Sequence, residues 1–249
     1  MATRRRLDAE LVRRGLAASR GEAQATVAAG RVLVNGAVAD KPARLVAAGD
    51  AIVIEGPPPR FVSRGGEKLD AALDHFGIDV RGLTVLDVGA STGGFTDCLL
   101  DRGATRVIAL DVGHGQLHPR IRADERVHVL ERTNIRETTP ATIGGLVDAV
   151  VVDVSFISLT LVIPILVTLC QPGAPMVLLV KPQFEAGRIE VSKGRGVITD
   201  PAIHARVRDE VAASLRAAGC DVIGWMESPI LGGEGNKEFL VHARTGVPS

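Results

Sequence analysis

The sequence predicts an α/β protein, in which a doubly wound, mostly parallel sheet with one antiparallel strand follows a small α+β domain. Three observations lead to this prediction. An apolar run at residues 83–88 leads into a glycine-rich turn at 89–94 and an amphipathic helix, the opening unit of a doubly wound sheet. Further short apolar runs alternate with helical stretches toward the C-terminus. Ahead of them, residues 1–56 combine two helical patterns with short strand patterns, and three consecutive prolines end that segment.

The length and composition of the chain are consistent with this fold class. The 249 residues suffice for two unequal domains, and an apolar content of 46% is enough for a substantial core. The cysteines at 98, 170 and 220 form no C-x-x-C pair, so they predict buried thiols in a reducing cytoplasm and no metal site. No apolar run follows the basic start, and the stretch 159–170 is too short to span a bilayer. We therefore expect a cytoplasmic protein without a membrane segment.

Charge is unevenly distributed along the chain, although the formal net charge is zero. Residues 1–68 contain ten arginines and two lysines against seven acidic residues, so the remainder carries the acidic excess. A basic segment on an acidic body suggests a polyanionic partner. A solvated, arginine-rich helix face explains the same charge equally well.

The N-terminal segment is predicted to hold two helices and then a small sheet. The first helix covers residues 6–14, and a capping box at Ser19–Glu22 opens a second helix that ends at Gly30. Asn35-Gly36 is the signal of a tight hairpin turn. The predicted strands are 31–34, 37–40 and 51–55.

This segment resembles the S4 RNA-binding domain. The resemblance rests on residues 7–15, on Ser19-Arg20 and on 30–36, and it implies that the basic helix face binds the RNA backbone. A guanidinium fork suits phosphate because it donates two hydrogen bonds. The candidate RNA-binding residues are Arg4, Arg5, Arg6, Arg13, Arg14, Arg20 and Arg31. The alternative is an accessory domain that merely packs on the body.

The remaining chain alternates strands and helices, as a doubly wound fold requires. We expect an S4-like domain at 1–56, a linker at 57–65 and a second domain at 66–249. The predicted strands of the second domain are 83–88, 106–110, 127–130, 148–153, 176–180, 221–226 and 238–243, the last two as antiparallel neighbours. The predicted helices include 66–76, 158–169 and 201–218, with a glycine-rich loop ahead of the last.

Ligands in such sheets bind outside the carboxyl ends of the strands, where Asp87, Asp111, Asp153 and Lys181 all fall. The turn at 89–94 lacks the second glycine of a dinucleotide fingerprint and the lysine of a phosphate loop. With an acidic residue after the second strand, it resembles the S-adenosylmethionine site of a Rossmann-type methyltransferase. The resemblance implies that the cofactor is lined by Gly89, Ser91, Gly93, Phe95, Asp111 and Asn134.

The residues after the fourth and fifth strands indicate the kind of acceptor. Asp153-Val-Ser-Phe156 lacks the paired prolines typical of base amino-group methylation, and no cysteine is placed for attack on a pyrimidine ring. The remaining possibility is methylation of a hydroxyl group. This reaction requires removal of the hydroxyl proton, because an alcohol is a poor nucleophile until its proton leaves. An amine takes that proton when burial or a second cation lowers its pKa. Lys68 beside Lys181 would supply the second cation, and Asp153 and Glu238 would hold both amines.

These four residues resemble the K-D-K-E tetrad of FtsJ-like ribose 2′-O-methyltransferases, and the two-domain chain resembles the TlyA, or hemolysin A, family. The supporting blocks are 62–69, 87–95, 153–158, 180–185 and 228–229. The resemblance implies 2′-O-methylation of cytidine in ribosomal RNA, free or in ribosomal subunits, with Lys181 as base. Phe95 departs from the tryptophan usual in the wider FtsJ-like pattern. The alternatives are a membrane-active hemolysin-type protein and a non-catalytic RNA-binding protein.

Overall fold

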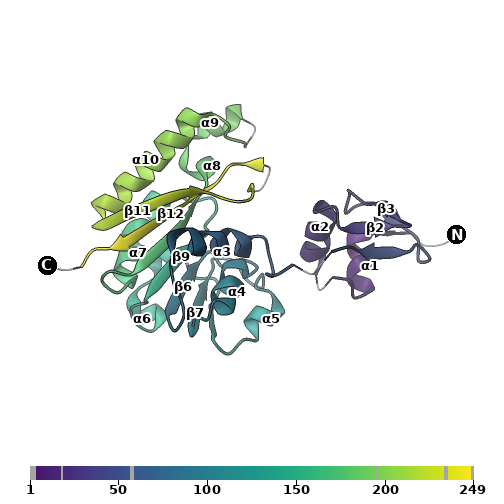
Figure 1. Cartoon of the computed structure of the whole chain (residues 1–249), viewed down its shortest axis with the longest axis horizontal. Helices are drawn as coiled ribbons and strands as arrows, with labels where there is room; N and C mark the ends of the chain where they lie inside the picture. The colour runs from purple at the N-terminus through teal and green to yellow at the C-terminus, as the bar shows by residue number, and fades with distance from the viewer. Residues whose placement is uncertain (1–3, 18, 57–58, 195, 233–234, 248–249) are drawn as a thin grey trace. The chain divides into compact units, whose positions relative to one another are not determined.

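The computed structural model describes residues 4–17, 19–56, 59–194, 196–232 and 235–247. The chain divides into two compact units, Met1–Arg60 and Phe61–Ser249 (Figure 1). Within the predicted linker at 57–65, Pro57 and Pro58 lie outside the described residues. Phe61 is already buried in the core of the second unit, and the first helix of that unit begins at Gly65.

The N-terminal unit places two helices beside two small sheets. Leu7 and Leu11 from the first helix and Val27 from the second are buried together with strand residues. Ser19 caps the second helix, since its side chain accepts from the backbone N–H of Glu22. The helices are α1 (Leu7–Arg13) and α2 (Arg20–Ala28). One sheet has the order β3 (Ala37–Val38), β2 (Val32–Val34), β5 (Ile52–Ile54), and the other pairs β1 (Arg5–Arg6) with β4 (Leu45–Val46).

The second unit is built on a seven-stranded sheet with the order β11-β12-β10-β9-β6-β7-β8. β12 runs antiparallel to both neighbours and the other pairings are parallel, which confirms the predicted fold class. The strands are β6 (Thr84–Val88), β7 (Arg106–Leu110), β8 (Val127–Leu130), β9 (Ala149–Val152), β10 (Pro175–Val180), β11 (Cys220–Glu227) and β12 (Phe239–Thr245). The polypeptide reverses its strand order at β6, so ligand binding is expected at the carboxyl ends of β6 and its neighbours.

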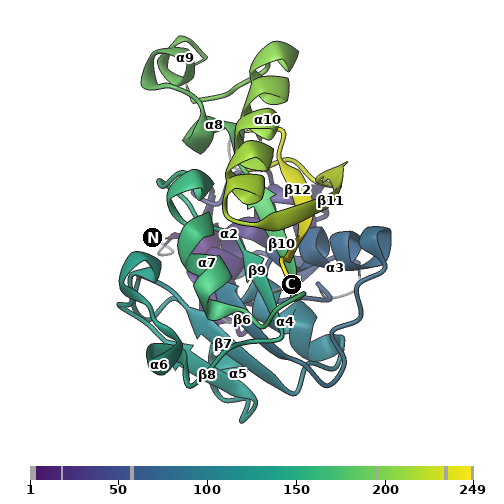
Figure 2. The ribbon, with the colours of Figure 1, turned by 90° about the vertical axis from the view of Figure 1, so that its left-hand side faces the viewer.

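Helices cover both faces of this sheet, because alternate residues of each central strand point to opposite faces. Leu86 and Val88 of β6 belong to a core with α7 and α10, whereas Val85 belongs to a second core with α3 and α4 (Figure 2). The longer helices are α3 (Gly65–Phe76), α4 (Gly94–Asp101), α7 (Ile163–Leu169) and α10 (Pro201–Ala217). The short ones are α5 (Pro119–Arg122), α6 (Pro140–Ile143), α8 (Pro182–Glu185) and α9 (Arg188–Lys193).

Two stretches differ from the sequence prediction. The helix expected at 158–169 begins as a 3-10 turn at Leu159–Leu161, and the α-helix starts only at Ile163. Pro164 explains this start, because proline lacks an N–H and is tolerated only in the first helical turn. The glycine-rich loop expected before α10 contains α9, so that stretch is not wholly a loop.

The three cysteines are buried thiols, as predicted. Among the residues that the structure describes, no helix is both long enough and apolar enough to cross a membrane. In the same residues, no group of three or more histidine, cysteine or acidic side chains is arranged to hold a metal ion.

Candidate active site

The glycine-rich turn after β6 is fixed against the ends of two neighbouring strands. Gly89 adopts a φ of +84°, and its N–H donates to the carbonyl of Leu110 at the end of β7 over 2.8 Å. A Cβ at Gly89 would lie 2.4 Å from the carbonyl oxygen of Asp153, which follows β9. Only glycine permits both the conformation and this close approach. The turn therefore connects the ends of β6, β7 and β9.

A cavity of about 540 Å³ opens beside this turn, along the carboxyl ends of β6, β7 and β9. Four of the predicted cofactor residues border it: Gly89, Ser91, Asp111 and Asn134. Asp111 also accepts a hydrogen bond from the backbone N–H of Ser91 over 2.8 Å, so one carboxylate oxygen stabilises the turn. The volume and the carboxylate at the end of β7 fit a nucleoside cofactor with ribose hydroxyls.

The other two predicted cofactor residues lie elsewhere. Gly93 precedes α4 with a φ of +95°, and a Cβ there would contact Leu117 at 2.9 Å. Phe95 is 3% exposed and borders a second cavity of about 230 Å³ on the other side of the turn. Neither residue borders the larger cavity.

Asp87, the fourth residue of β6, is fully buried beneath the turn. Its Oδ2 accepts from the hydroxyl of Thr96 over 2.6 Å, and its Oδ1 has no partner among the described residues. Burial raises the pKa of Asp87 to about 7, because the apolar surroundings disfavour the charged form.

Two lysine–carboxylate ion pairs lie at the same edge of the sheet. Lys181 directly follows β10 and Asp153 directly follows β9, and these parallel neighbours end side by side. The Nζ of Lys181 lies 2.5 Å from Oδ1 of Asp153 and forms an ion pair with it, but the angles of this contact are not those of a hydrogen bond. The Nζ instead donates a hydrogen bond to the hydroxyl of Ser155 over 3.0 Å. Antiparallel pairing of β12 with β10 brings Glu238 to this edge as well.

Glu238 forms the second pair with Lys68 from the first turns of α3. Their atoms Nζ and Oε2 are 2.5 Å apart, and both side chains are almost fully buried. Lys68 and Asp153 both border the 230 Å³ cavity, and Asp153 also borders the larger one. The four predicted catalytic residues thus form two ion pairs, of which Lys68 and Asp153 border the cavities whereas Lys181 and Glu238 border neither.

Three further residues near Lys181 were not singled out from the sequence. Glu185 accepts from the hydroxyl of Ser158 over 2.6 Å and from the N–H of Leu159 over 2.9 Å, and burial raises its pKa. It therefore connects the segment after β10 to the segment after β9. Phe156 is 91% exposed with a φ of +63°, and its ring centre lies 5.0 Å from that of Phe184. These residues lie in the segments 153–158 and 180–185, which support the family resemblance, but the sequence of neither segment predicted the contacts.

The predicted RNA-binding arginines lie in the N-terminal unit, mostly in contact with two acidic side chains of α1. Arg6 and Arg20 contact Asp8, and Arg13 and Arg14 contact Glu10. Arg31 instead donates to the carbonyls of residues 55 and 56, and Arg4 is exposed.

A mostly parallel seven-stranded sheet with one antiparallel strand, a glycine-rich turn after β6 and an acidic residue after β7 define a Rossmann-type methyltransferase. The sequence matches the FtsJ-like methyltransferase family over residues 61–245 and the S4 domain over residues 5–52. The chain belongs to the FtsJ-like methyltransferases, within the two-domain TlyA or hemolysin A group, and is an S-adenosylmethionine-dependent enzyme.

Known relatives share nearly the whole chain. It is 50% identical over 98% of its length to the 16S/23S rRNA (cytidine-2′-O)-methyltransferase TlyA of Mycobacterium tuberculosis, covering 91% of that protein. It is 41% identical over 95% of its length to Hemolysin A of Brachyspira hyodysenteriae, covering 98% of it. A solved structure titled "Putative hemolysin from Streptococcus thermophilus" superposes with a TM-score of 0.79 at 41% identity, covering 99% of this chain and 90% of that one.

Proposed function

We propose that this enzyme methylates the ribose 2′-hydroxyl of cytidine in ribosomal RNA, with Lys181 as the general base. The observation that carries the proposal is the Lys181–Asp153 pair at the end of adjacent strands, where Asp153 borders both cavities. The choice of cytidine as the nucleotide and of ribosomal RNA as the substrate rests on the relatives that are named for this reaction. The S4 domain supports RNA as the substrate.

The proposed reaction is an in-line displacement for which the protein positions both reactants and removes one proton. S-adenosylmethionine, when bound, supplies an electrophilic methyl group on sulfur. The hydroxyl proton would pass to the Nζ of Lys181, which must first have lost its own ammonium proton to solvent, as the ribose oxygen takes the methyl group and the sulfur keeps the bonding electrons. Asp153 and Ser155 hold that amine in place. Lys68, held by Glu238, adds positive charge that stabilises the negative charge developing on the oxygen.

Two features support a nucleotide on the acceptor side. Phe156 presents an exposed aromatic ring at the border of the cofactor cavity, and single nucleotides are commonly held by stacking on such rings. The arginines of the N-terminal unit offer guanidinium groups to the phosphate backbone. Ribosomal subunits, as well as free ribosomal RNA, are the proposed substrates, which would place the enzyme in the cytoplasm.

The test is transfer of labelled methyl groups from S-adenosylmethionine to ribosomal RNA and to ribosomal subunits. The product should resist alkali at the modified linkage, because alkaline cleavage of RNA needs a free 2′-hydroxyl. Lys181→Ala should abolish transfer while cofactor binding, measured by calorimetry, stays within a few-fold. Lys181→Arg is the sharper variant, since it keeps the charge but cannot accept a proton at neutral pH.

Each outcome bears on a different part of the proposal. Near-normal turnover by Lys181→Arg would refute the assignment of Lys181 as the base. Label that fails to enter any RNA, with cofactor still bound, would refute the acceptor. Release of dye from liposomes by the purified protein would instead favour the membrane-active alternative.

A further inference from the structure

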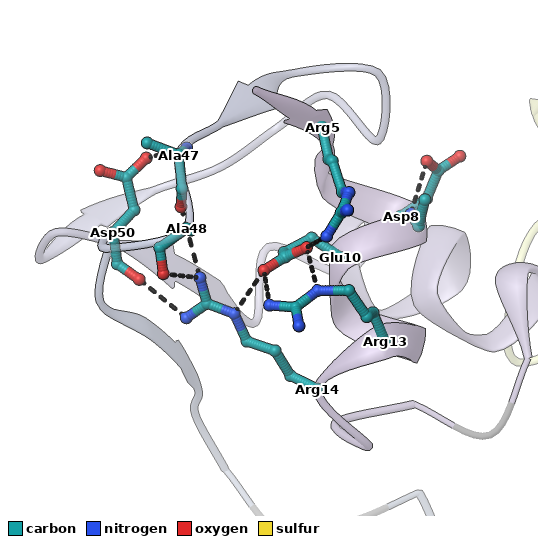
Figure 3. A network of polar contacts seen from close by, with 9 residues as sticks. Arg5, Asp8, Glu10, Arg13, Arg14, Ala47, Ala48 and Asp50 are labelled. Carbon is teal, nitrogen blue, oxygen red and sulfur yellow. Dashed lines mark hydrogen bonds and ion pairs between the residues drawn. The ribbon is translucent and has the colours of Figure 1, made fainter. Parts of the chain in front are cut away.

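Two acidic side chains of α1 are almost completely buried in the N-terminal unit, although that unit is rich in exposed arginines. Asp8 is 0% exposed and Glu10 is 2% exposed. Carboxylates are rarely buried unless they are paired, because the loss of hydration is costly. Here both carboxylates are paired with arginine side chains, as the network in Figure 3 shows for Glu10.

Asp8 connects the start of the chain to α2. Arg6 donates two hydrogen bonds to it, from Nε over 3.1 Å and from Nη2 over 2.9 Å. From α2, Arg20 donates over 3.3 Å and Gln24 over 3.0 Å, both to Oδ2. The hydrogen bond from Arg6 holds the pKa of Asp8 well below its usual range, so the carboxylate is charged at neutral pH.

Glu10 contacts a second set of arginines (Figure 3). Arg13 donates to its two oxygens over 2.7 and 2.5 Å, and Arg14 donates over 2.8 Å. Arg5 approaches it from β1 at 3.8 Å. Hydrogen bonds from Arg13 and then Arg14 lower the pKa of Glu10 to about 2.

The arginines around these carboxylates differ in what they can still bind. Arg14 is only 22% exposed, and its terminal nitrogens donate to the carbonyls of Asp50 and Ala48 over 2.8 and 3.0 Å. Its donors are therefore used within the unit. The other four side chains are about half exposed: Arg5 at 52%, Arg6 at 47%, Arg13 at 49% and Arg20 at 59%.

We propose that Asp8 and Glu10 are positioning residues for RNA, which hold Arg6, Arg20, Arg5 and Arg13 as a preorganised set of phosphate-binding groups. A guanidinium has five N–H donors, so one held by a carboxylate on one edge still presents donors on another. Holding long side chains before binding removes part of the entropy cost of ordering them on the RNA. The inference rests on the proposed RNA-binding role of this unit.

The proposal predicts the opposite sign from simple charge counting. Removing a negative charge from a basic surface should strengthen binding to a polyanion, if arginines act only through their net charge. If the carboxylates position the arginines, Asp8→Asn and Glu10→Gln should instead weaken binding, although each variant adds net positive charge. Asparagine keeps the shape of Asp8 and an oxygen for the N–H of Ala9, which donates to the carboxylate over 2.8 Å.

The experiment measures binding of the full-length protein to protein-free ribosomal RNA by filter retention at several salt concentrations. Asp8→Asn and Glu10→Gln should each weaken binding by roughly fivefold, from the ordering of about two side chains. Asp40→Asn is the matched control, because it removes an exposed carboxylate from the same unit. It should leave binding unchanged or slightly stronger.

A double-mutant cycle separates positioning from a general folding defect. In a background of Arg6→Ala with Arg20→Ala, Asp8→Asn should change RNA affinity no more than Asp40→Asn does. A persistent fivefold loss there would overturn the proposal, and so would stronger binding by Asp8→Asn in the wild-type background. If the Arg6→Ala and Arg20→Ala changes themselves left affinity unaltered, the proposed RNA-binding role of the unit would fail instead.

Discussion

Replacing Gly89 with alanine should show how closely the glycine-rich turn is fitted to the end of β9. The left-handed conformation alone costs an alanine about 1–2 kcal/mol. The new Cβ would also lie 2.4 Å from the carbonyl oxygen of Asp153, a backbone atom that cannot rotate away. Forcing an atom into such a site typically costs about 1–3 kcal/mol more. The expected loss of stability is therefore about 2–5 kcal/mol.

Gly82→Ala is the matched control for this prediction. Gly82 has a similar φ of +77°, but a Cβ there would meet no atom within 4 Å. Gly82→Ala should therefore lower the free energy of unfolding only by the cost of the left-handed conformation, about 1–2 kcal/mol. Denaturant unfolding followed by the fluorescence of Trp225, the single tryptophan, reports on the second unit alone. Calorimetry with S-adenosylmethionine should show at least about tenfold weaker binding by Gly89→Ala, equal to about 1.4 kcal/mol. Equal stability losses and equal cofactor affinities in the two variants would refute the reasoning.

Three further predictions follow from the same structure. Because Asp87 has a folded pKa of about 7, the folded protein keeps a proton that the unfolded chain loses near pH 4, so stability should fall as pH rises through that window. Asp87→Asn should remove roughly 3 kcal/mol of that pH dependence, as measured by unfolding at pH 5 and pH 8. Glu185→Ala should lower kcat by roughly tenfold through loss of two hydrogen bonds, whereas Glu190→Ala, at an exposed ion pair, should not. Arg14→Lys should destabilise the N-terminal unit by about 1–2 kcal/mol in thermal unfolding, and Arg20→Lys should change its stability by less than half of that.

The central strands of the second unit could be predicted well because they are buried on both faces. Such strands appear in the sequence as almost continuous apolar runs between turn residues. The predicted strand at 106–110 has the same bounds as β7, and the predicted strand at 127–130 has the same bounds as β8, although β8 is a partly exposed edge strand. The two-residue strands β1 and β4 could not be found in this way, since their pairing depends on the fold around them.

The sequence predicted that Asp153 and Glu238 hold the two lysine amines, but it did not show for both lysines which carboxylate each one contacts. Asp153 and Lys181 end neighbouring parallel strands, so the sequence alone predicts that they are close. Lys68 and Glu238 are separated by 170 residues, and their contact depends on how α3 packs near the start of β12. The contacts of Glu185 were equally hidden, because a carboxylate that joins two loops has no sequence pattern of its own.

Charge counting found the basic segment but could not assign roles to its members. Arg14 and Arg20 are equivalent in a count, yet Arg14 donates to backbone carbonyls while Arg20 remains more than half exposed. Asp8 and Glu10 even lower the net positive charge of this segment. Their value becomes visible only when the hydrogen bonds show which side chains they hold.

Asp153 shows why cofactor binding and catalysis should be coupled in this enzyme. Its N–H donates to the carbonyl of Val88 over 2.9 Å, its own carbonyl lies against Gly89, and its carboxylate pairs with Lys181. A shift of the glycine-rich turn would therefore move the partner of the proposed base. It follows that Gly89→Ala should lower kcat even when S-adenosylmethionine is saturating, in addition to weakening cofactor binding. An unchanged kcat at saturation would mean that the turn serves the cofactor alone.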